Sequence, residues 1–398
     1  MTVDSALASA CRARGTADSR GWYEVYYVTA ALPGGRAVWL RYTLDCPTGA
    51  DATTSVWGVA FDLTQPRWFA ARTTMAAGHW QPREEGGVDI GPTWQVAPDA
   101  CSGAVRNPYG RRMRWELRWN HGPGPLSYFP ERLEALARTS TFPIVCVPMA
   151  RAEGTVEVDS EVIACDGVPV QQSHLFGGRH AHRWGWLHAL GFDGDPDGFL
   201  TGVWAVPQRF SGRLPAVSSL LAGLHGEVFR SSSLRALRWV DRGGDVVAFR
   251  GRAGRLRVDG TAVTRLDRLC GVTYQDPDGS SVWCSNTEVA DLRVVVSNGG
   301  RAEDLMCTAA CGFERGSRAA GACVAAPLRP PSTPQPSRTA GASNQSGWLN
   351  EPLVRPGATA GCAPPRAPGK NGSRWCCADT RPPPSRRCRA ALRSHARP

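Results

Sequence analysis

The chain has 398 residues, of which 42% are hydrophobic, and this is enough for two ordinary domains with a sizeable core. Its formal net charge is +11, but residues 301–398 alone hold fourteen Arg, one Lys and five acidic residues. The first 300 residues are therefore almost neutral. This excludes a strongly basic groove in the folded part, and we predict no nucleic-acid partner.

The N-terminal sequence MTVDSALASACRARG lacks the apolar stretch of a signal peptide. No segment approaches about 18 consecutive apolar residues, so we expect no integral membrane segment and predict a cytoplasmic protein. Seven of the fourteen cysteines precede residue 300, and none of these seven belongs to a CxxC pair. In a reducing compartment we expect them to be buried as small hydrophobic side chains.

Runs rich in Val, Tyr, Trp and Thr recur along the chain between clusters of Gly, Pro and Asp, which is typical of antiparallel strands. The first series starts at residues 22–30 and ends at 111–120, and a second series runs from 154–167 to 281–296. Within RMRWELRW, Trp115 and Leu117 alternate with charged residues, as in a half-buried strand. The pattern predicts an all-β protein with two antiparallel barrels or sandwiches.

We predict five segments in chain order: a flexible N-terminus (1–19), a first β-barrel (20–128), a linker (129–153), a second β-barrel (154–300) and a disordered tail rich in Pro, Arg and Ala (301–398). The linker contains the one helical candidate, PERLEALARTS. The strand-like VADLRVVV should be followed by more strand, but the pattern ends there. We hypothesise a frameshift near residues 297–305 that removes the closing strand of the second barrel; a genuine basic tail is the alternative.

Residues 173–188, SHLFGGRHAHRWGWLH, hold four of the eight histidines and two tryptophans. If a strand begins at Arg179, one face carries His180, His182, Trp184, Trp186 and His188. Large amphipathic rings are typical of a cavity wall for a mostly apolar ligand. The alternatives are histidines and indoles that only support the fold, and a zinc site. Zinc would need His180 and His182 plus a third ligand such as His174, His188 or Glu288, and we predict no metal.

Two further sets of polar residues fall on strand faces. Glu24 and Arg41 lie on neighbouring predicted strands and are expected to form an ion pair across a hairpin. Glu288 shares a face with Asn286, and a carboxylate inside an apolar barrel would have a raised pKa and could act as a general acid. The alternative for Glu288 is a buried salt bridge to an arginine such as Arg179.

Five stretches carry a family resemblance: WYEVYYVT, VWLRYTL, GTVEVDSEVIACDGVP, QSHLFGGRHAHRWGWLHALGF and WCSNTEVADLRV. Through them residues 20–297 resemble the two-barrel, lipocalin-like proteins of the calycin group. These are related to hydroxyneurosporene synthase (a carotenoid hydratase) and tocopherol cyclase, and the chain most resembles uncharacterised bacterial members. The resemblance implies two antiparallel calycin barrels with a cavity at their junction. It also implies no metal or organic cofactor, an apolar partner such as an isoprenoid, and acid chemistry on an alkene.

We therefore expect binding of an apolar, isoprenoid- or lipid-like small molecule at the barrel junction. The expected ligand-binding residues are Arg179, His180, Trp184, Trp186 and His188, with Arg179 at the polar end of the ligand. The alternative is a hydratase, cyclase or isomerase without a cofactor. In that case Glu288 or protonated His182 would donate a proton, and the indoles would stabilise the carbocation. The sequence leaves the oligomeric state open.

Overall fold

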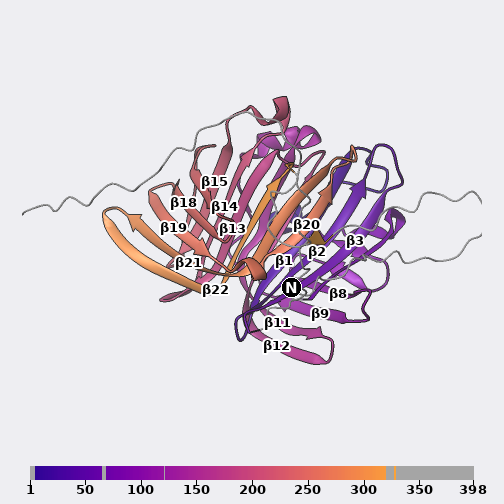
Figure 1. Cartoon of the computed structure of the whole chain (residues 1–398), viewed down its shortest axis with the longest axis horizontal. Coiled ribbons are helices and arrows are strands. Elements are labelled where there is room, and N and C mark those ends of the chain that lie inside the picture. Colours follow the sequence, from indigo (N-terminus) through magenta and orange to yellow (C-terminus); the bar gives the residue numbers. More distant parts are fainter. Residues whose placement is uncertain (1–4, 65–68, 121, 320–326, 329–398) are drawn as a thin grey trace, which may run out of the picture. The chain divides into compact units, whose positions relative to one another are not determined.

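The structure, a computed structural model, describes residues 5–64, 69–120, 122–319 and 327–328. The described strands all belong to one compact unit, Met1–Leu353, in which they form two curved, mainly antiparallel sheets (Figure 1). The prediction of an all-β fold with two antiparallel barrels or sandwiches is confirmed. Among the helices that the structure describes, none has the length and hydrophobicity to cross a membrane.

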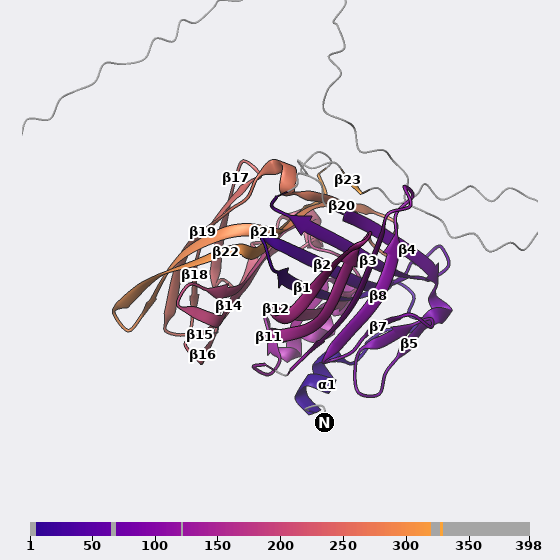
Figure 2. The same ribbon diagram turned by 90° about the horizontal axis from the view of Figure 1, so that it is seen from below.

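The first sheet has the strand order β4-β3-β2-β1-β12-β11-β9-β8-β7-β6-β5, with β10 beside β11. Its strands are β1 (Trp22–Leu32), β2 (Arg36–Cys46), β3 (Thr53–Asp62), β4 (Phe69–Ala76), β5 (Trp80–Pro82), β6 (Val88–Ile90), β7 (Trp94–Val96), β8 (Ala100–Arg106), β9 (Arg112–Trp119), β10 (Leu126–Ser127), β11 (Thr141–Val158) and β12 (Glu161–Gly177). Helix α1 (Ser5–Cys11) lies at one end of this sheet, against β11 (Figure 2).

The second sheet has the order β16-β15-β14-β13-β22-β21-β19-β18-β17, with β20 beside β21 and β23 beside β20. Its strands are β13 (Arg183–Phe192), β14 (Asp195–Val206), β15 (Val217–Leu224), β16 (Glu227–Arg230), β17 (Leu237–Arg242), β18 (Val246–Ala253), β19 (Leu256–Val263), β20 (Cys270–Gln275), β21 (Ser281–Asn298), β22 (Arg301–Ser317) and β23 (Pro327–Leu328). The 3-10 helices are η1 (Ala77–His79), η2 (Glu131–Thr139), η3 (Arg209–Gly212) and η4 (Leu266–Arg268).

Both sheets are built in the same order. The first long strand, β1 or β13, pairs on one side with a meander of the strands that follow it in the chain. On its other side it pairs with a long strand from the end of the same half, which is β12 for β1 and β22 for β13. Each half is therefore closed by its last long strand.

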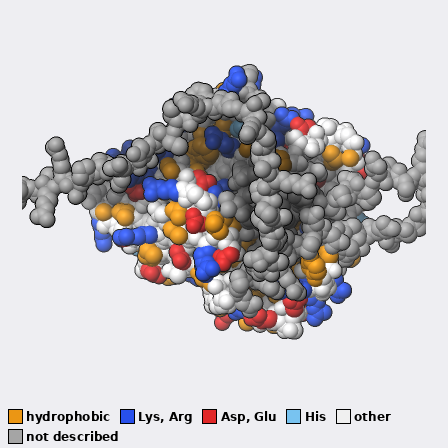
Figure 3. Space-filling model, in the orientation of Figure 1, with side chains coloured by type: hydrophobic (Ala, Val, Ile, Leu, Met, Phe, Trp, Pro, Cys, Tyr) orange, Lys and Arg blue, Asp and Glu red, His pale blue; other side chains and the backbone are white. Residues whose placement is uncertain are grey.

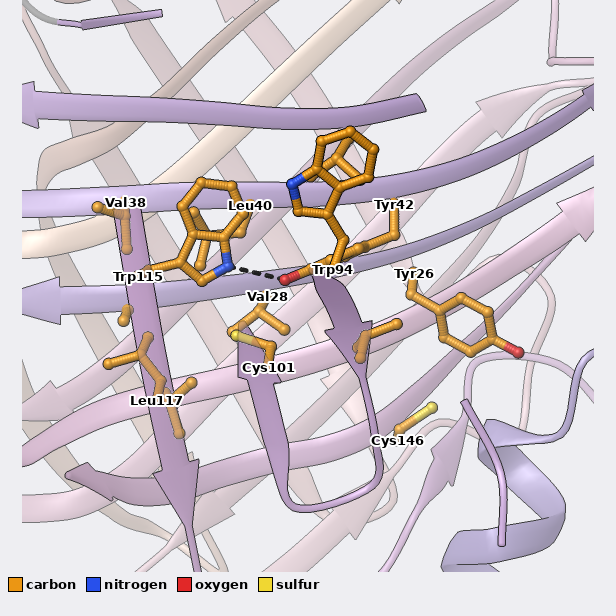
Figure 4. Close-up of a cluster of buried hydrophobic side chains, with 14 of the residues drawn as sticks. Tyr26, Val28, Val38, Leu40, Tyr42, Trp94, Cys101, Trp115, Leu117 and Cys146 are labelled. Atoms are coloured by element: carbon orange, nitrogen blue, oxygen red, sulfur yellow. Dashed lines mark hydrogen bonds between the residues drawn. The ribbon is translucent and has the colours of Figure 1, made fainter. Parts of the chain in front are cut away.

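Alternating burial along the strands builds one core inside each sheet and a third cluster between the sheets. In β9, Trp115 and Leu117 are buried and alternate with exposed residues, as predicted. Figure 4 shows these two side chains in the core of the first sheet, where Trp115 Nε1 donates a hydrogen bond of 2.8 Å to the hydroxyl of Tyr42. The seven cysteines before residue 300 are free and buried, which confirms their predicted role as core residues.

The outer surface carries both signs of charge. On the face shown in Figure 3, basic and acidic side chains are mixed with hydrophobic ones over the part that the structure describes. Eight Arg residues in these ranges form an ion pair with an Asp or Glu although their own side chains are more than a third exposed; examples are Arg250 with Asp259 and Arg293 with Asp304. Exposed pairs of this kind contribute little to stability.

Three predicted segment boundaries are wrong. The segment predicted as a flexible N-terminus (1–19) contains helix α1, in which Leu7 and Cys11 are buried. The segment predicted as a linker (129–153) holds the 3-10 helix η2 and the first part of β11. Strands β11 and β12 pair with β9 and β1, so the predicted start of the second barrel at residue 154 lies inside the first sheet. The register of β11 shifts near Pro148. Because proline and register shifts interrupt the alternation of side chains, the sequence pattern did not predict this strand.

The predicted loss of a closing strand after residue 300 is also wrong. Residues 301–317 form β22, which pairs with β13 on one side and β21 on the other. Its inward positions include Leu305, Cys307, Cys311 and Phe313, so the alternation of a strand continues through the segment where a frameshift was hypothesised. Cys and Ala occupy inward positions where β-branched residues are usual. For this reason the composition of the segment did not indicate a strand. The predicted disordered tail beyond residue 319 lies outside the described residues, apart from β23.

Candidate functional site

The histidine-rich stretch joins the two sheets. Strand β12 ends at Gly177 and β13 begins at Arg183, so His180 and His182 lie in a connecting loop and not on a strand. The backbone N–H of Gly178 donates to the carbonyl of Ala137, 2.8 Å away, at the end of η2. A Cβ atom at Gly178 would lie 2.2 Å from the carbonyl oxygen of Arg138, so only glycine allows the loop to approach η2 this closely.

Strand β13 presents its indoles to the first sheet. Leu187 and Ala189 belong to the core of the second sheet, whereas Trp186 lies in the cluster between the sheets. The ring of Trp186 meets Tyr27 of β1 edge-on, with 5.4 Å between centroids, and stacks on His188 at 4.8 Å. The alternation predicted from Trp184 to His188 therefore holds, and this face points toward the other sheet.

A cavity of about 430 Å³ lies between the sheets. Its wall combines aromatic and aliphatic side chains of both halves, including Tyr27, Trp39, Phe129, Leu175, Val203 and Tyr274. Of the residues predicted to bind ligand, Arg179, His180, Trp184 and Trp186 line it. His182, His188 and Glu288 are not among the lining residues.

His180 is held in place by rings and by a buried carboxylate. Its ring lies between Tyr23, at 4.4 Å, and Tyr274, at 5.3 Å, and is nearly parallel to both. Its Nδ1 and its backbone N–H both contact Oδ1 of Asp276, at 2.6 and 2.9 Å. Arg318 binds the other oxygen of Asp276 and donates to the carbonyl of His180 at 3.0 Å. The loop, β20 and the end of β22 therefore meet at one carboxylate.

Asp276 makes the stability of this junction depend on pH. Burial raises the pKa of Asp276, but the hydrogen bonds and charges of His180 and Arg318 outweigh burial, and the pKa lies below its ordinary value. The unfolded pKa is about 3.9, so the ionised group stabilises the fold above that pH, and this contribution is lost as the pH falls through the lower folded pKa.

We expect Asp276→Asn to lower Tm at pH 7 by at least about 5 °C, because removing one partner of a buried ion pair costs about 3 kcal/mol or more. The difference from the native chain should shrink below about pH 4. Thermal unfolding followed by circular dichroism between pH 3 and 7 measures both effects. Asp197→Asn is the control, because the Asp197 side chain is 79% exposed. A difference in Tm that is the same at pH 3 and pH 7 would contradict this role of Asp276.

The histidines of the stretch have separate partners. Nε2 of His174 lies 2.8 Å from Oε1 of Glu24, and its Nδ1 donates to the carbonyl of Ala10. Nδ1 of His182 lies 3.0 Å from Oε1 of Gln208, which lines the cavity. In the ranges that the structure describes, no three His, Cys, Asp or Glu side chains are grouped as a metal site would require.

His188 and Glu288 form a buried pair beside the cavity. Nε2 of His188 lies 2.6 Å from Oε2 of Glu288, and Asn286 donates to Oε1 at 3.2 Å. Burial raises the pKa of Glu288, while the charge and hydrogen bond of His188 oppose this rise. Both side chains of the pair lie against Gly312 of β22. A Cβ atom at this position would lie 2.3 Å from Glu288 Oε2 and 2.3 Å from His188 Nε2. The salt bridge between Glu288 and Arg179, considered from the sequence, is not formed; Arg179 pairs with Asp278.

The predicted ion pair between Glu24 and Arg41 is wrong. Arg41 is opposite Tyr27 in the register of β1 and β2, whereas Glu24 is opposite Leu44. The two residues lie on opposite faces of the sheet: Glu24 contacts His174 on the inner side, and Arg41 lines the cavity between the sheets. The sequence showed that Trp39 and Arg41 share a face but not which face pointed inward.

Glu314 and Tyr274 are cavity residues that the sequence interpretation missed. Glu314 accepts a hydrogen bond of 2.7 Å from Trp184 Nε1. It lies in β22, within the segment predicted as the tail. The alternation of buried and exposed residues earlier in β22 is the sequence signal that could have identified this strand. Tyr274 lies in β20 and stacks on His180.

Comparisons with known proteins add the following similarities. No family model matches the chain. It is 27% identical over 317 residues to uncharacterised proteins from two strains of Mycobacterium tuberculosis, covering 75% of this chain and 88% of each relative. These relatives confirm the predicted likeness to uncharacterised bacterial proteins.

Similar solved structures include a protein assigned as AttH from Nitrosomonas europaea, with 14% identity and a TM-score of 0.44 over 76% of this chain and 94% of that one. They also include CghA with Sch210972, with 10% identity and a TM-score of 0.46 over 74% and 88%. A third is kievitone hydratase from Nectria haematococca, with 10% identity and a TM-score of 0.41 over 78% and 94%.

Proposed function

We propose that this protein binds an apolar small molecule in the cavity between the two sheets. The observation that carries the proposal is the cavity itself, of about 430 Å³, with a wall that is mainly aromatic and aliphatic and that both sheets supply. Small-molecule sites typically have volumes of about 300–1,000 Å³, mostly apolar walls and a few polar groups. Trp184 and Trp186 provide flat apolar surface, and His180 and Arg179 provide polar contacts.

A second depression, of about 710 Å³, suits an apolar ligand less well. It lies at the end of the first sheet, beside η2. Its lining is rich in charged side chains, which are Arg14, Asp18, Arg20, Glu131, Glu134 and Arg138. An apolar molecule there would cover charged groups without replacing their contacts with water.

Binding is favoured over the acid-catalysed alternative by the place of the predicted acid. A general acid must come within about 3 Å of the atom that it protonates, or reach it through one water molecule. The carboxylate of Glu288 is held by His188 and Asn286 and is not part of the cavity wall. The role of Glu288 and His182 as proton donors stays a prediction from the sequence.

The proposal is tested by filling the cavity. Ala205 lines it from β14, and Ala205→Trp places an indole in the space that the ligand would occupy. We expect this variant to bind the neutral dye Nile red at least tenfold more weakly than the native chain, measured by fluorescence titration with 1-hexadecanol as competitor. Val162→Trp is the matched control, because Val162 is 63% exposed on β12.

Both variants should keep the Tm of the native chain within a few degrees. Equal dye affinity in the native chain, Ala205→Trp and Val162→Trp would show that the dye binds elsewhere, and the proposed site would be abandoned.

A further inference from the structure

Arg41 is a buried cation in an apolar wall. Its side chain extends from β2 toward the second sheet, and the residue is only 6% exposed. Its guanidinium carbon lies 4.2 Å from the centre of the Tyr274 ring and 5.7 and 5.8 Å from those of Trp39 and Trp57. Within the described part of the chain, the buried Nε of Arg41 has no hydrogen-bond partner.

A neighbouring arginine shows what Arg41 lacks. Arg72 lies over the same indole, Trp57, at 4.5 Å. Arg72 has a carboxylate partner, Asp45, at 3.7 Å, and donates two hydrogen bonds to the hydroxyl of Ser55. None of the acidic residues in the described ranges forms an ion pair with Arg41, which contacts three aromatic rings instead.

The other basic side chains that line the cavity are exposed to water or have acidic partners, and Arg209 is the exposed one. Arg179 pairs with Asp278, and His180 pairs with Asp276. Arg179 is the residue that the sequence suggested for the polar end of the ligand. Because Arg179 already has an acidic partner, Arg41 is the buried arginine of the cavity wall whose charge has no acidic partner among the described residues.

A guanidinium removed from water requires compensation. Cation–π contacts supply part of it, but they satisfy no N–H donor. The planar fork of a guanidinium matches the two oxygens of a carboxylate, and such charge-assisted hydrogen bonds are among the strongest in proteins. An acceptor that enters the cavity would complete the environment of Arg41.

We propose that the ligand is a long-chain carboxylic acid whose carboxylate pairs with Arg41 while its chain lies along the aromatic wall. This inference rests on the proposed function and names the class of ligand. Glu314, which also lines the cavity, accepts a hydrogen bond from Trp184 and would repel a second carboxylate there. The acid group is therefore directed toward Arg41 and the chain toward Trp184 and Trp186.

The test compares hexadecanoic acid with 1-hexadecanol, which has the same chain but no charge. Each displaces Nile red from the full chain at pH 8, where the bound acid is ionised. The native chain should prefer the acid at least tenfold. Arg41→Met should remove this preference and leave the affinity for the alcohol within about threefold, whereas Arg41→Lys should keep part of it. Arg250→Gln is the control for net charge, because Arg250 is an exposed residue of β18 paired with Asp259.

The outcomes separate this inference from the proposed function. If acid and alcohol bind the native chain equally, the cavity binds apolar molecules but the role of Arg41 is wrong. The same conclusion follows if Arg41→Met keeps the preference for the acid. If neither compound displaces the dye, the proposed function itself fails. Should Arg41→Met not fold, the preference of the native chain and that of Arg41→Lys still decide the question.

Discussion

A chain that ends at Gly300 is expected to lose the second sheet, whereas a chain that ends at Leu328 keeps it. The shorter chain lacks β22, whose 17 residues pair with both β13 and β21. It also loses the fully buried side chains of Cys311 and Phe313. Burying a single large apolar side chain contributes about 1.5–3 kcal/mol, and a whole domain is stable by only about 5–15 kcal/mol. The missing strand removes enough of this total to unfold the second half.

The measurement is urea unfolding of both chains, followed by near-ultraviolet circular dichroism, together with limited proteolysis. The shorter chain should be cleaved rapidly within residues 183–298 and should not bind Nile red. The longer chain retains every described strand and serves as the control. Native-like resistance to protease in the chain that ends at Gly300 would mean that β22 is dispensable, contrary to its place between two strands.

His174→Ala is expected to lower the free energy of unfolding by about 3–5 kcal/mol, because it removes the side-chain partner that lies 2.8 Å from the buried Glu24 carboxylate. Glu24 and His174 are both fully buried. The Glu24 carboxylate also accepts the backbone N–H groups of Arg14 and Gly15, at 2.7 and 2.5 Å. Without the imidazole, the buried carboxylate would keep these backbone donors and a long hydrogen bond of 3.4 Å from the hydroxyl of Tyr26.

Urea unfolding of the native chain, His174→Ala, Glu24→Gln and the double variant forms a double-mutant cycle. The two single effects should add to more than the effect of the double variant. Because His174 Nδ1 also donates a hydrogen bond to the carbonyl of Ala10, trypsin should cut after Arg14 faster in His174→Ala. His79→Ala replaces an exposed histidine and should change neither property. Strict additivity in the cycle would show that the pair is not coupled.

The sequence predicted those features that depend on neighbouring residues. Alternation identified β9 from Trp115 and Leu117, and it placed Trp184 and Trp186 on one face of β13. It could not reveal a strand whose period is broken by proline and register shifts, as in β11, or one whose inward side chains are Cys and Ala, as in β22.

The partners of the polar residues could not be predicted in the same way. His180 meets Asp276 across 96 positions of sequence, and His188 meets Glu288 across 100. Which face of a sheet is covered by the other sheet is a property of the whole fold. For this reason Arg41 was assigned to an ion pair with Glu24, although the residues lie on opposite sides of β1 and β2.

The closure of each half by its last long strand also determines when the protein can fold during synthesis. The ribosome releases the chain from its N-terminus, and N-terminal parts generally fold first. The first half can be completed once β12 has emerged, because β12 pairs directly with β1. The second must wait for β22, more than a hundred residues later, and until then β13 has an open edge. Since Tyr274 and Glu314 line the cavity, its wall is completed only when translation has passed nearly all of the described chain.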